Sequence, residues 1–510
     1  MKQARESLCW RGIRGTGLWI GRRYQSGCVA AFFRWLGGWI NAIWRGSAIR
    51  RAIVHNGAVA RSWESSIFCR ILTEIVNFVS SIAYVLYPVL RGSVVWKFFC
   101  ALDRQLYVLI SWVILALLVV PNDNWNNTYS FAAVLIFWFI ASVAVRKDQR
   151  FRFKLSELTP WTVAFAFFVC LSCVFSVSRS DSVRYLCFHM TCMLLVILCV
   201  TVIEKTRQLV RLDIFAMFGL IAASGCAWYQ KITGVEVDEM MVDLTVNQDT
   251  PGRVFSFFEN PNAFGIVIVM LLPIALALLI RSKSFWVRLL AVVAILSSFP
   301  ALMMTYSRGA WVGLAVALVL FFIIQWPKLT PLLILLCLLA LPAMPDTILH
   351  RVFSMLNSTD SSVNSRIPVY KAMLGLIREH PITGVGLGSD AVRSAIASSG
   401  HYHSTTLFVH GHDIYLQIWA ETGIFGLITF LGAMFTAIRD GMRVIVCRKA
   451  QPMLRSLTAA GVSGLAGTLV FSIADYPWSY PRVMTIFWLM FAMLLTAIRL
   501  AKREADGEEV

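Results

Sequence analysis

Long apolar stretches alternate with short polar loops over most of this 510-residue chain. A helix that crosses the hydrocarbon core of a bilayer needs about 20 mostly apolar residues. Backbone groups in lipid must bond within their own segment, so helices are expected rather than open strands. The pattern predicts an all-α, polytopic membrane bundle of about twelve helices. The predicted spans are residues 105–121, 129–145, 160–178, 183–203, 209–230, 262–281, 286–304, 309–326, 329–344, 413–438, 455–474 and 481–500.

Charged residues in the loops predict the orientation of the bundle. Basic loops, such as residues 146–154, 204–211, 281–288 and 439–455, alternate with loops that carry fewer cations. Loops rich in Lys and Arg stay on the cytoplasmic side. The sequence therefore predicts a multi-pass protein of the cytoplasmic membrane with both termini in the cytoplasm. A long loop, residues 345–412, then faces outward.

Composition supports the membrane class and separates an N-terminal region from the spans. Only 15% of the residues are charged, against about 25% in soluble domains. In residues 1–104, arginines interleave with Trp, Phe and Ile, which is typical of amphipathic helices on an anionic cytoplasmic leaflet. Residues 105–510 form the predicted transmembrane domain. The net charge of +18 fits cytoplasmic loops better than nucleic-acid binding, because the sequence shows no nucleic-acid-binding module.

Six of the eight histidines fall between His350 and His412, in the long outward loop. Histidine changes charge near neutral pH, and polar groups at a membrane boundary are costly to keep there without a function. His412 precedes Asp413 and the next apolar run. Its neutral imidazole could accept a proton from a hydroxyl, or this pair could simply cap the helix. Glu421 lies deeper in that run, so we expect it to face the bundle interior and support the loop by hydrogen bonds.

Three arginines lie at predicted outward edges, against the positive-inside trend: Arg253, Arg308 and Arg366. A guanidinium keeps its charge and offers a fork of donors that fits phosphate oxygens. Several such groups around one pocket would bind a diphosphate without a metal ion. The alternative is that these arginines extend to lipid headgroups.

Two other patterns in the long loop have the composition of ligand sites. The HxH pairs at 401–403 and 410–412 could bind zinc, although their spacing is not a strong zinc signature. The glycine-rich segment 384–389 looks like a phosphate-binding loop, but it does not belong to a βαβ unit. A re-entrant or surface turn is the better interpretation of this segment. The sequence therefore predicts no metal and no other cofactor.

Four segments, in order, resemble the O-antigen ligase and O-antigen polymerase family: GRVFSFFENPNAFG, TYSRGAWVG, SRIPVYKAMLGLIREHPITGVGLGS and HDIYLQIWAETGIFG. The resemblance covers about residues 250–440. It implies the fold of the metal-independent type C glycosyltransferases and a glycan donor on undecaprenyl diphosphate. On this resemblance, Arg308 and Arg366 match arginines that contact the diphosphate, and His412 matches the proposed base. Members commonly have His-Asn where this chain has His412-Asp413.

The expected function is transfer of a glycan at the outer face of the membrane, in the assembly of a cell-surface polysaccharide. His412 would deprotonate an acceptor hydroxyl, while Arg308 and Arg366, helped by Arg253, hold the departing diphosphate. The acceptor (a growing glycan, a lipid or a protein) would distinguish a polymerase from a ligase, and the sequence leaves this open. A transporter or flippase of polyprenyl-linked glycans is the alternative. It is less favoured because the polar residues gather at the outer surface rather than at broken helices in mid-membrane.

Overall fold

The computed structural model describes residues 65–82, 105–148, 155–234, 252–258, 260–327, 366–400, 410–447 and 449–507, with a few isolated residues between them. Within these ranges the secondary structure is helical and includes no strand. The longer helices are α5 (Ile67–Ile82), α8 (Leu106–Val119), α9 (Asn127–Asp148), α10 (Pro160–Val174), α11 (Arg179–Val202), α12 (Thr206–Thr233), α13 (Pro261–Arg281), α14 (Phe285–Met304), α15 (Arg308–Gln325), α19 (Arg366–Glu379), α20 (Ser389–Ser399), α21 (Ile414–Cys447), α22 (Pro452–Phe471) and α23 (Pro481–Ala505).

The predicted polytopic helical bundle is confirmed. Among the described residues, eight helices are long and apolar enough to cross a bilayer, and three shorter apolar helices accompany them. Together they coincide with every predicted span except residues 329–344, which lie outside the described ranges. Most of residues 1–104 lies outside them too, as do residues 345–365 of the long loop.

Helices α13 and α23 form the centre of the bundle, since they are the most deeply buried of the long spans. Close backbone contacts bring their neighbours together. At Gly313 of α15 and Gly467 of α22, a Cβ on either residue would collide with the carbonyl of the other. Gly464 of α22 lies equally close to the backbone of Met270 in α13. Small residues are needed at such points because helices in lipid associate by close packing rather than by the hydrophobic effect.

Helix α21 is broken near its beginning, where Gly423 has φ 73° and ψ 179°. The carbonyl groups of Ala420 and Glu421, just before the break, accept hydrogen bonds from the N–H groups of Val385 and Gly386 at 2.8 and 3.3 Å. The glycine-rich segment thus supplies donors that the interrupted helix lacks. A Cβ at Gly423 would overlap the backbone of the loop that contacts it, so this position requires glycine.

The glycine-rich segment, residues 384–389, is buried throughout. Of the two predicted alternatives, a re-entrant or a surface turn, the surface turn is therefore wrong, because this segment enters the packing between α11 and α21. Gly386 and Gly388 have positive φ values, and a Cβ on them would overlap the side chains of Ser182 and Tyr185 in α11. These glycines permit close packing and leave no space for a phosphate at those positions.

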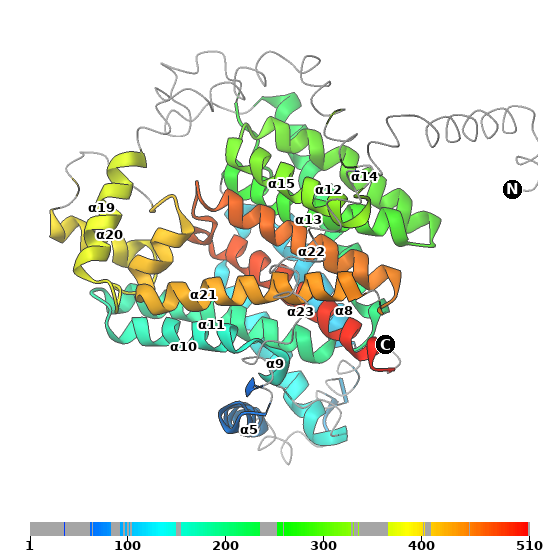
Figure 1. Cartoon of the computed structure of the whole chain (residues 1–510), viewed down its shortest axis with the longest axis horizontal. Helices are drawn as coiled ribbons and strands as arrows, with labels where there is room; N and C mark the ends of the chain where they lie inside the picture. The colour runs from blue at the N-terminus through cyan, green and yellow to red at the C-terminus, as the bar shows by residue number, and fades with distance from the viewer. Residues whose placement is uncertain are drawn as a thin grey trace, which may run out of the picture.

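The two ends of the bundle differ in what they carry. Helices α19 and α20 lie together at one end, beyond the start of α21, and the C-terminus lies towards the other (Figure 1). We call the first the site end and the second the C-terminal end. A backbone hydrogen bond of 3.0 Å from the Ile414 N–H to the Ser472 carbonyl ties the start of α21 to the chain that follows α22. This contact brings two loops of the site end side by side.

Candidate active site

The predicted His412-Asp413 pair lies where the chain enters α21. Asp413 caps the helix, because its Oδ1 accepts hydrogen bonds from the N–H groups of Tyr415 and Leu416 at 2.7 and 2.9 Å. Burial raises the pKa of Asp413, although these two bonds oppose the shift. His412 has φ 50°, a left-handed conformation that is uncommon for residues other than glycine. The backbone strain there needs support from its surroundings.

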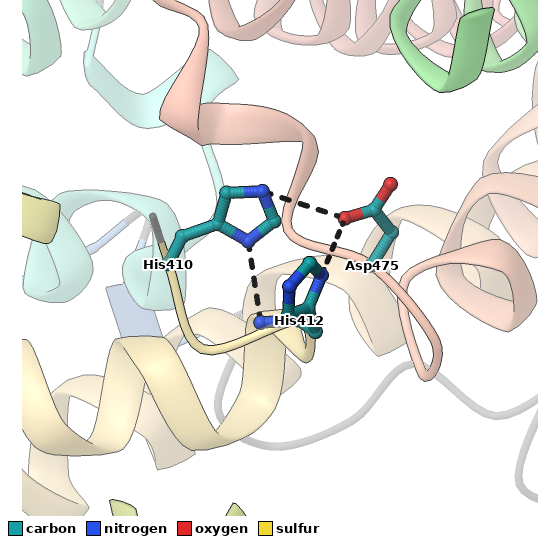
Figure 2. A group of neighbouring side chains, drawn as sticks. All are labelled: His410, His412 and Asp475. Carbon is teal, nitrogen blue, oxygen red and sulfur yellow. Dashed lines mark hydrogen bonds and ion pairs between the residues drawn. The ribbon is translucent and has the colours of Figure 1, made fainter. Parts of the chain in front are cut away.

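Asp475, in the loop between α22 and α23, faces two imidazoles at once (Figure 2). Its Oδ1 lies 3.7 Å from His410 Nε2 and 3.6 Å from His412 Nδ1. The two histidine rings are themselves 4.3 Å apart between centroids. The two distances from the Asp475 oxygen to the imidazole nitrogens are longer than ordinary hydrogen bonds and lie within ion-pair range. The two histidines and the carboxylate form what we call the His412 cluster.

His410 is the buried imidazole of the His412 cluster. Its Nδ1 accepts a hydrogen bond of 3.3 Å from the backbone N–H of His412, which helps to hold the left-handed conformation there. An accepting Nδ1 carries no proton, so the proton of a neutral ring lies on Nε2, towards Asp475. Burial lowers the pKa of His410 to about 4, and Asp475 only partly opposes this shift. His410 is therefore neutral at physiological pH.

The carboxylate of Asp475 is buried but well supported. It accepts hydrogen bonds from the Tyr476 N–H at 2.9 Å and from Asn262 Nδ2 at 2.8 Å. Burial acts to raise the pKa of Asp475. The neighbouring His412, His410 and Arg366 outweigh that effect and hold the pKa below the usual range for aspartate. Asp475 is therefore an anion at neutral pH.

His412 is the accessible member of the cluster. Its side chain is 30% exposed, whereas those of His410 and Asp475 are 6% and 10% exposed. Its Nδ1 is buried without a partner at hydrogen-bond distance and faces the carboxylate. A proton on Nδ1 would be stabilised by that anion, and Nε2 would then remain unprotonated and able to act as a base.

Arg253 is linked to the His412 cluster through the side-chain amide of Asn262. Arg253 donates from one terminal nitrogen to Asn262 Oδ1 at 3.0 Å and from Nε to the Thr305 carbonyl at 2.8 Å. Asn262 in turn donates to Asp475. Thr305 lies three residues before Arg308, which is the first residue of α15. Arg253 therefore lies on a hydrogen-bonded path that leads to the cluster, and Arg308 follows its partner Thr305 closely in the chain.

Arg366 lies at the first turn of α19 and acts on the cluster electrostatically. Its charge favours the anion of Asp475 and disfavours a charged His410. One turn further along, Tyr370 donates from its hydroxyl to the His412 carbonyl at 3.2 Å. Burial raises the pKa of Tyr370, so this hydroxyl stays protonated. These contacts hold α19 next to His412.

Glu421 belongs to a second group of hydrogen bonds behind the cluster. Its Oε1 accepts from Gln417 Nε2 at 2.8 Å and from the Tyr476 hydroxyl at 3.2 Å. Gln417 Oε1 accepts from the Gly411 N–H at 3.0 Å. We call these residues the Glu421 network. It connects the loop before α21 with the loop that carries Asp475. Among the described residues, the Glu421 side chain bonds to Gln417 and Tyr476 rather than to either histidine of the cluster.

The sequence interpretation missed Asp475 and Asn262. Asp475 lies between the predicted spans 455–474 and 481–500, and Asn262 lies in the segment GRVFSFFENPNAFG, but neither was predicted as a site residue. The one available signal for Asp475 was an acid at a predicted membrane edge, where an anion needs a partner. Nothing in the sequence spacing indicated that the partners would be His410 and His412.

The His412 cluster also has the composition of a small metal site. One ligand atom from each of His410, His412 and Asp475 lies within 4.8 Å of the others. Two imidazoles and a carboxylate are a ligand set that zinc accepts. The positive charge of Arg366, which acts on both Asp475 and His410, disfavours a divalent cation here. The histidines at 401 and 403, the other half of the HxH pattern, lie outside the described residues.

Comparison with known proteins gives one positive finding. Residues 293–431 match the family model described as O-antigen ligase. This segment includes Arg308, Arg366, His412 and Glu421, whereas Asp475 lies beyond it. No curated protein matches the chain in sequence. The predicted resemblance to the O-antigen ligase family is confirmed over the matched segment, and it supports a glycosyltransferase-like membrane function in polysaccharide assembly.

Proposed function

We propose that this protein transfers a glycan from a polyprenyl-diphosphate donor, such as undecaprenyl diphosphate, to an acceptor hydroxyl. The observation that carries the proposal is the geometry of His412, a part-exposed imidazole whose Nδ1 faces the Asp475 anion. That arrangement favours a proton on Nδ1 and leaves Nε2 to act as the base, as in other catalytic carboxylate–histidine pairs. The O-antigen ligase match over residues 293–431 supplies the reaction class.

The proposed reaction is a single inverting displacement. His412 Nε2 takes the proton of the acceptor hydroxyl as its oxygen bonds to the anomeric carbon. The bond from that carbon to the diphosphate oxygen breaks, and its electron pair leaves with the diphosphate. The imidazolium that forms is stabilised by Asp475 until the proton passes to solvent. Because attack comes from the side opposite the leaving group, the anomeric configuration inverts.

Arginines would stabilise the leaving diphosphate. Arg308 and Arg366 are proposed to bind its oxygens, and Arg253 is proposed to assist. Arg366 acts electrostatically on the His412 cluster, and Arg253 is bonded to both Asn262 and Thr305. The positive charges would therefore lie close to the base, which the reaction requires because bond breaking and deprotonation occur together.

We place the site on the outer face of the cytoplasmic membrane, with both termini in the cytoplasm. The basis is the alternation of basic loops, which puts the C-terminal end of the bundle inside and the site end outside. The donor would enter sideways from the lipid, because its polyprenyl chain is apolar and its diphosphate is not. Asp413 and Glu421 are assigned supporting roles, since the first caps α21 and the second bonds Gln417 and Tyr476.

The decisive experiment supplies the purified protein, in vesicles, with a short glycan on polyprenyl diphosphate and with candidate acceptors. We expect release of polyprenyl diphosphate together with a longer glycan or a glycosylated lipid or protein. The identity of that product distinguishes a polymerase from a ligase. Passage of the intact donor across the vesicle membrane, with no bond broken, would instead identify a flippase.

The variant Asp475→Asn tests the proposed base, His412, by changing only the carboxylate that faces it. An amide keeps the shape of the side chain but cannot stabilise an imidazolium. We expect kcat to fall at least about tenfold with little change in donor KM, because the substitution affects charge that develops only during the reaction. An equal fall in donor affinity with unchanged kcat would contradict the role assigned to Asp475.

A further inference from the structure

Helix α5, which precedes all the predicted spans, has three distinct faces. One face packs against the bundle, where Cys69 and Ser80 are only 2% and 4% exposed and the part-buried Leu72 and Val76 contact the core. A second face carries large exposed apolar side chains: Ile67, Phe68, Ile71, Ile75, Phe78 and Val79. A third face carries the exposed charges Arg70 and Glu74. At 3.6 residues per turn, these sets occupy successive sectors of the helix.

The packing face fixes α5 against α9 and the basic loop that follows it. Ser80 Oγ accepts a hydrogen bond of 3.0 Å from Trp138 Nε1 in α9. Asn77 exchanges two hydrogen bonds with the backbone of Phe153, at 2.9 and 3.1 Å. Phe153 stacks on Trp138 with ring centroids 4.1 Å apart. Three hydrogen bonds from α5, to partners that are themselves stacked on each other, define one orientation of α5 on the bundle.

That orientation differs from the direction of the spans. Figure 1 shows α5 end-on beside α9, whereas α21 and α22 run across the view. A helix that crosses the membrane would run with α21 and α22, and α5 instead lies across them.

We propose that α5 is an interfacial helix that binds the lipid bilayer itself. Its apolar face lies among the acyl chains of the leaflet nearest the basic loops, and its charged face meets the headgroups. Two observations favour lipid over a protein partner. Helix α9, to which α5 is bonded, also exposes large apolar side chains, at Phe131, Leu135 and Ile136. The adjoining loop, residues 146–154, carries five Lys or Arg residues, which suits anionic headgroups.

The inference is independent of the proposed glycan transfer, because none of its residues lies near the His412 cluster. If α5 binds the membrane surface, it positions the helices that it contacts. By holding the loop at Phe153, α5 fixes the end of α9 and the start of α10 at the membrane surface. A helix that binds the interface at a set depth would fix the depth of the bundle in the bilayer.

Photocrosslinking on the full-length chain tests the proposal. The photoreactive amino acid benzoylphenylalanine replaces Phe68, Ile75 or Phe78 on the apolar face, and Glu74 on the charged face as the matched control. After irradiation of membranes containing the protein, mass spectrometry of the α5 peptide identifies what was captured. Each substituted protein is first shown to elute at the same position as the unsubstituted one.

We expect phospholipid acyl chains on the three apolar-face positions, with roughly tenfold less at position 74, because only the apolar face lies in the hydrocarbon region. Capture of a second copy of the chain, or of another protein, at the apolar positions would overturn the proposal. Equal lipid labelling at all four positions, or none at any, would overturn it as well.

Discussion

Two polar groupings meet at the loop between α22 and α23, and they differ in how tightly their members are bonded. In the Glu421 network, one buried carboxylate accepts from Gln417 and Tyr476 at 2.8 and 3.2 Å. In the His412 cluster, both imidazoles stand 3.6 to 3.7 Å from Asp475, and His412 is 30% exposed. Fully satisfied buried networks make a structure rigid, whereas a loosely held and accessible imidazole can exchange a proton. We therefore expect the Glu421 network to stabilise the structure and the His412 cluster to carry out the chemistry.

The two groupings are joined through two adjacent residues, one in each grouping. Asp475 belongs to the His412 cluster, and the hydroxyl of Tyr476 bonds to Glu421. Burial and the nearby Glu421 raise the pKa of Tyr476, so its hydroxyl remains a donor. The position of the Asp475 carboxylate thus depends on the rigid network behind it. A loose catalytic geometry can be reproducible only when its neighbours are fixed.

Replacing His412 has the largest expected effect on function. His412→Ala removes the proposed base, so transfer should fall by about 10²- to 10⁴-fold, the usual contribution of general base catalysis. The side chain is partly exposed, and its loss should therefore change the thermal midpoint little. Initial rates in vesicles and thermal unfolding of the purified protein measure the two effects. Normal product from this variant would remove His412 from the mechanism.

Acid should weaken the fold through the buried member of the cluster. The folded pKa of His410 is about 4, against an ordinary value of 6.5. Between these values the unfolded chain takes up a proton at this residue and the folded chain does not. Stability is therefore complete above about pH 6.5 and falls towards pH 4, by up to about 3 kcal/mol from this group.

The matched variant for the acid effect is His410→Asn, whose Oδ1 can still accept from the His412 N–H. The pKa of Asp475 is lowered, so this carboxylate adds acid sensitivity only when the pH falls below about 4, the ordinary pKa of an aspartate. The variant should therefore lose less stability than the natural protein between pH 6.5 and 4.5. Thermal midpoints measured across that interval make the comparison. Parallel curves for the two proteins would contradict a neutral, buried His410.

Fold and site differed in how far the sequence could predict them. Spans were predictable because each one depends on about 20 consecutive residues. His412 could be singled out because it lies at a loop-to-helix junction within a resembling motif. Asp475 could not, because its partners lie about sixty residues earlier and meet it only through the packing of α21 on α22. Gly423 lies inside the predicted span 413–438, but its positive φ depends on a loop contact that helical periodicity does not contain.

Variants of Glu421 test whether the Glu421 network supports the fold or takes part in the chemistry. Glu421→Ala leaves the donors of Gln417 and Tyr476 buried without their acceptor, so stability should fall by about 2 kcal/mol. Glu421→Gln keeps an acceptor oxygen, and we expect a smaller loss together with substantial activity. Thermal midpoints and initial rates of both variants should move together. A Glu421→Gln protein that is stable but inactive would place Glu421 in the chemistry and remove the contrast between the groupings.

Removal of divalent metal is expected to leave the transfer rate unchanged. A zinc ion held by His410, His412 and Asp475 would convert the loose cluster into a tightly bonded one, and it would occupy an imidazole nitrogen needed for proton transfer. The charge of Arg366 on this cluster opposes such an ion. Transfer rates should therefore be equal before and after EDTA treatment, with elemental analysis confirming that metal has been removed. Activity that disappears with EDTA and returns with zinc would show that the 3.6 Å separation is a ligand spacing, and His412 could then no longer be described as a free base.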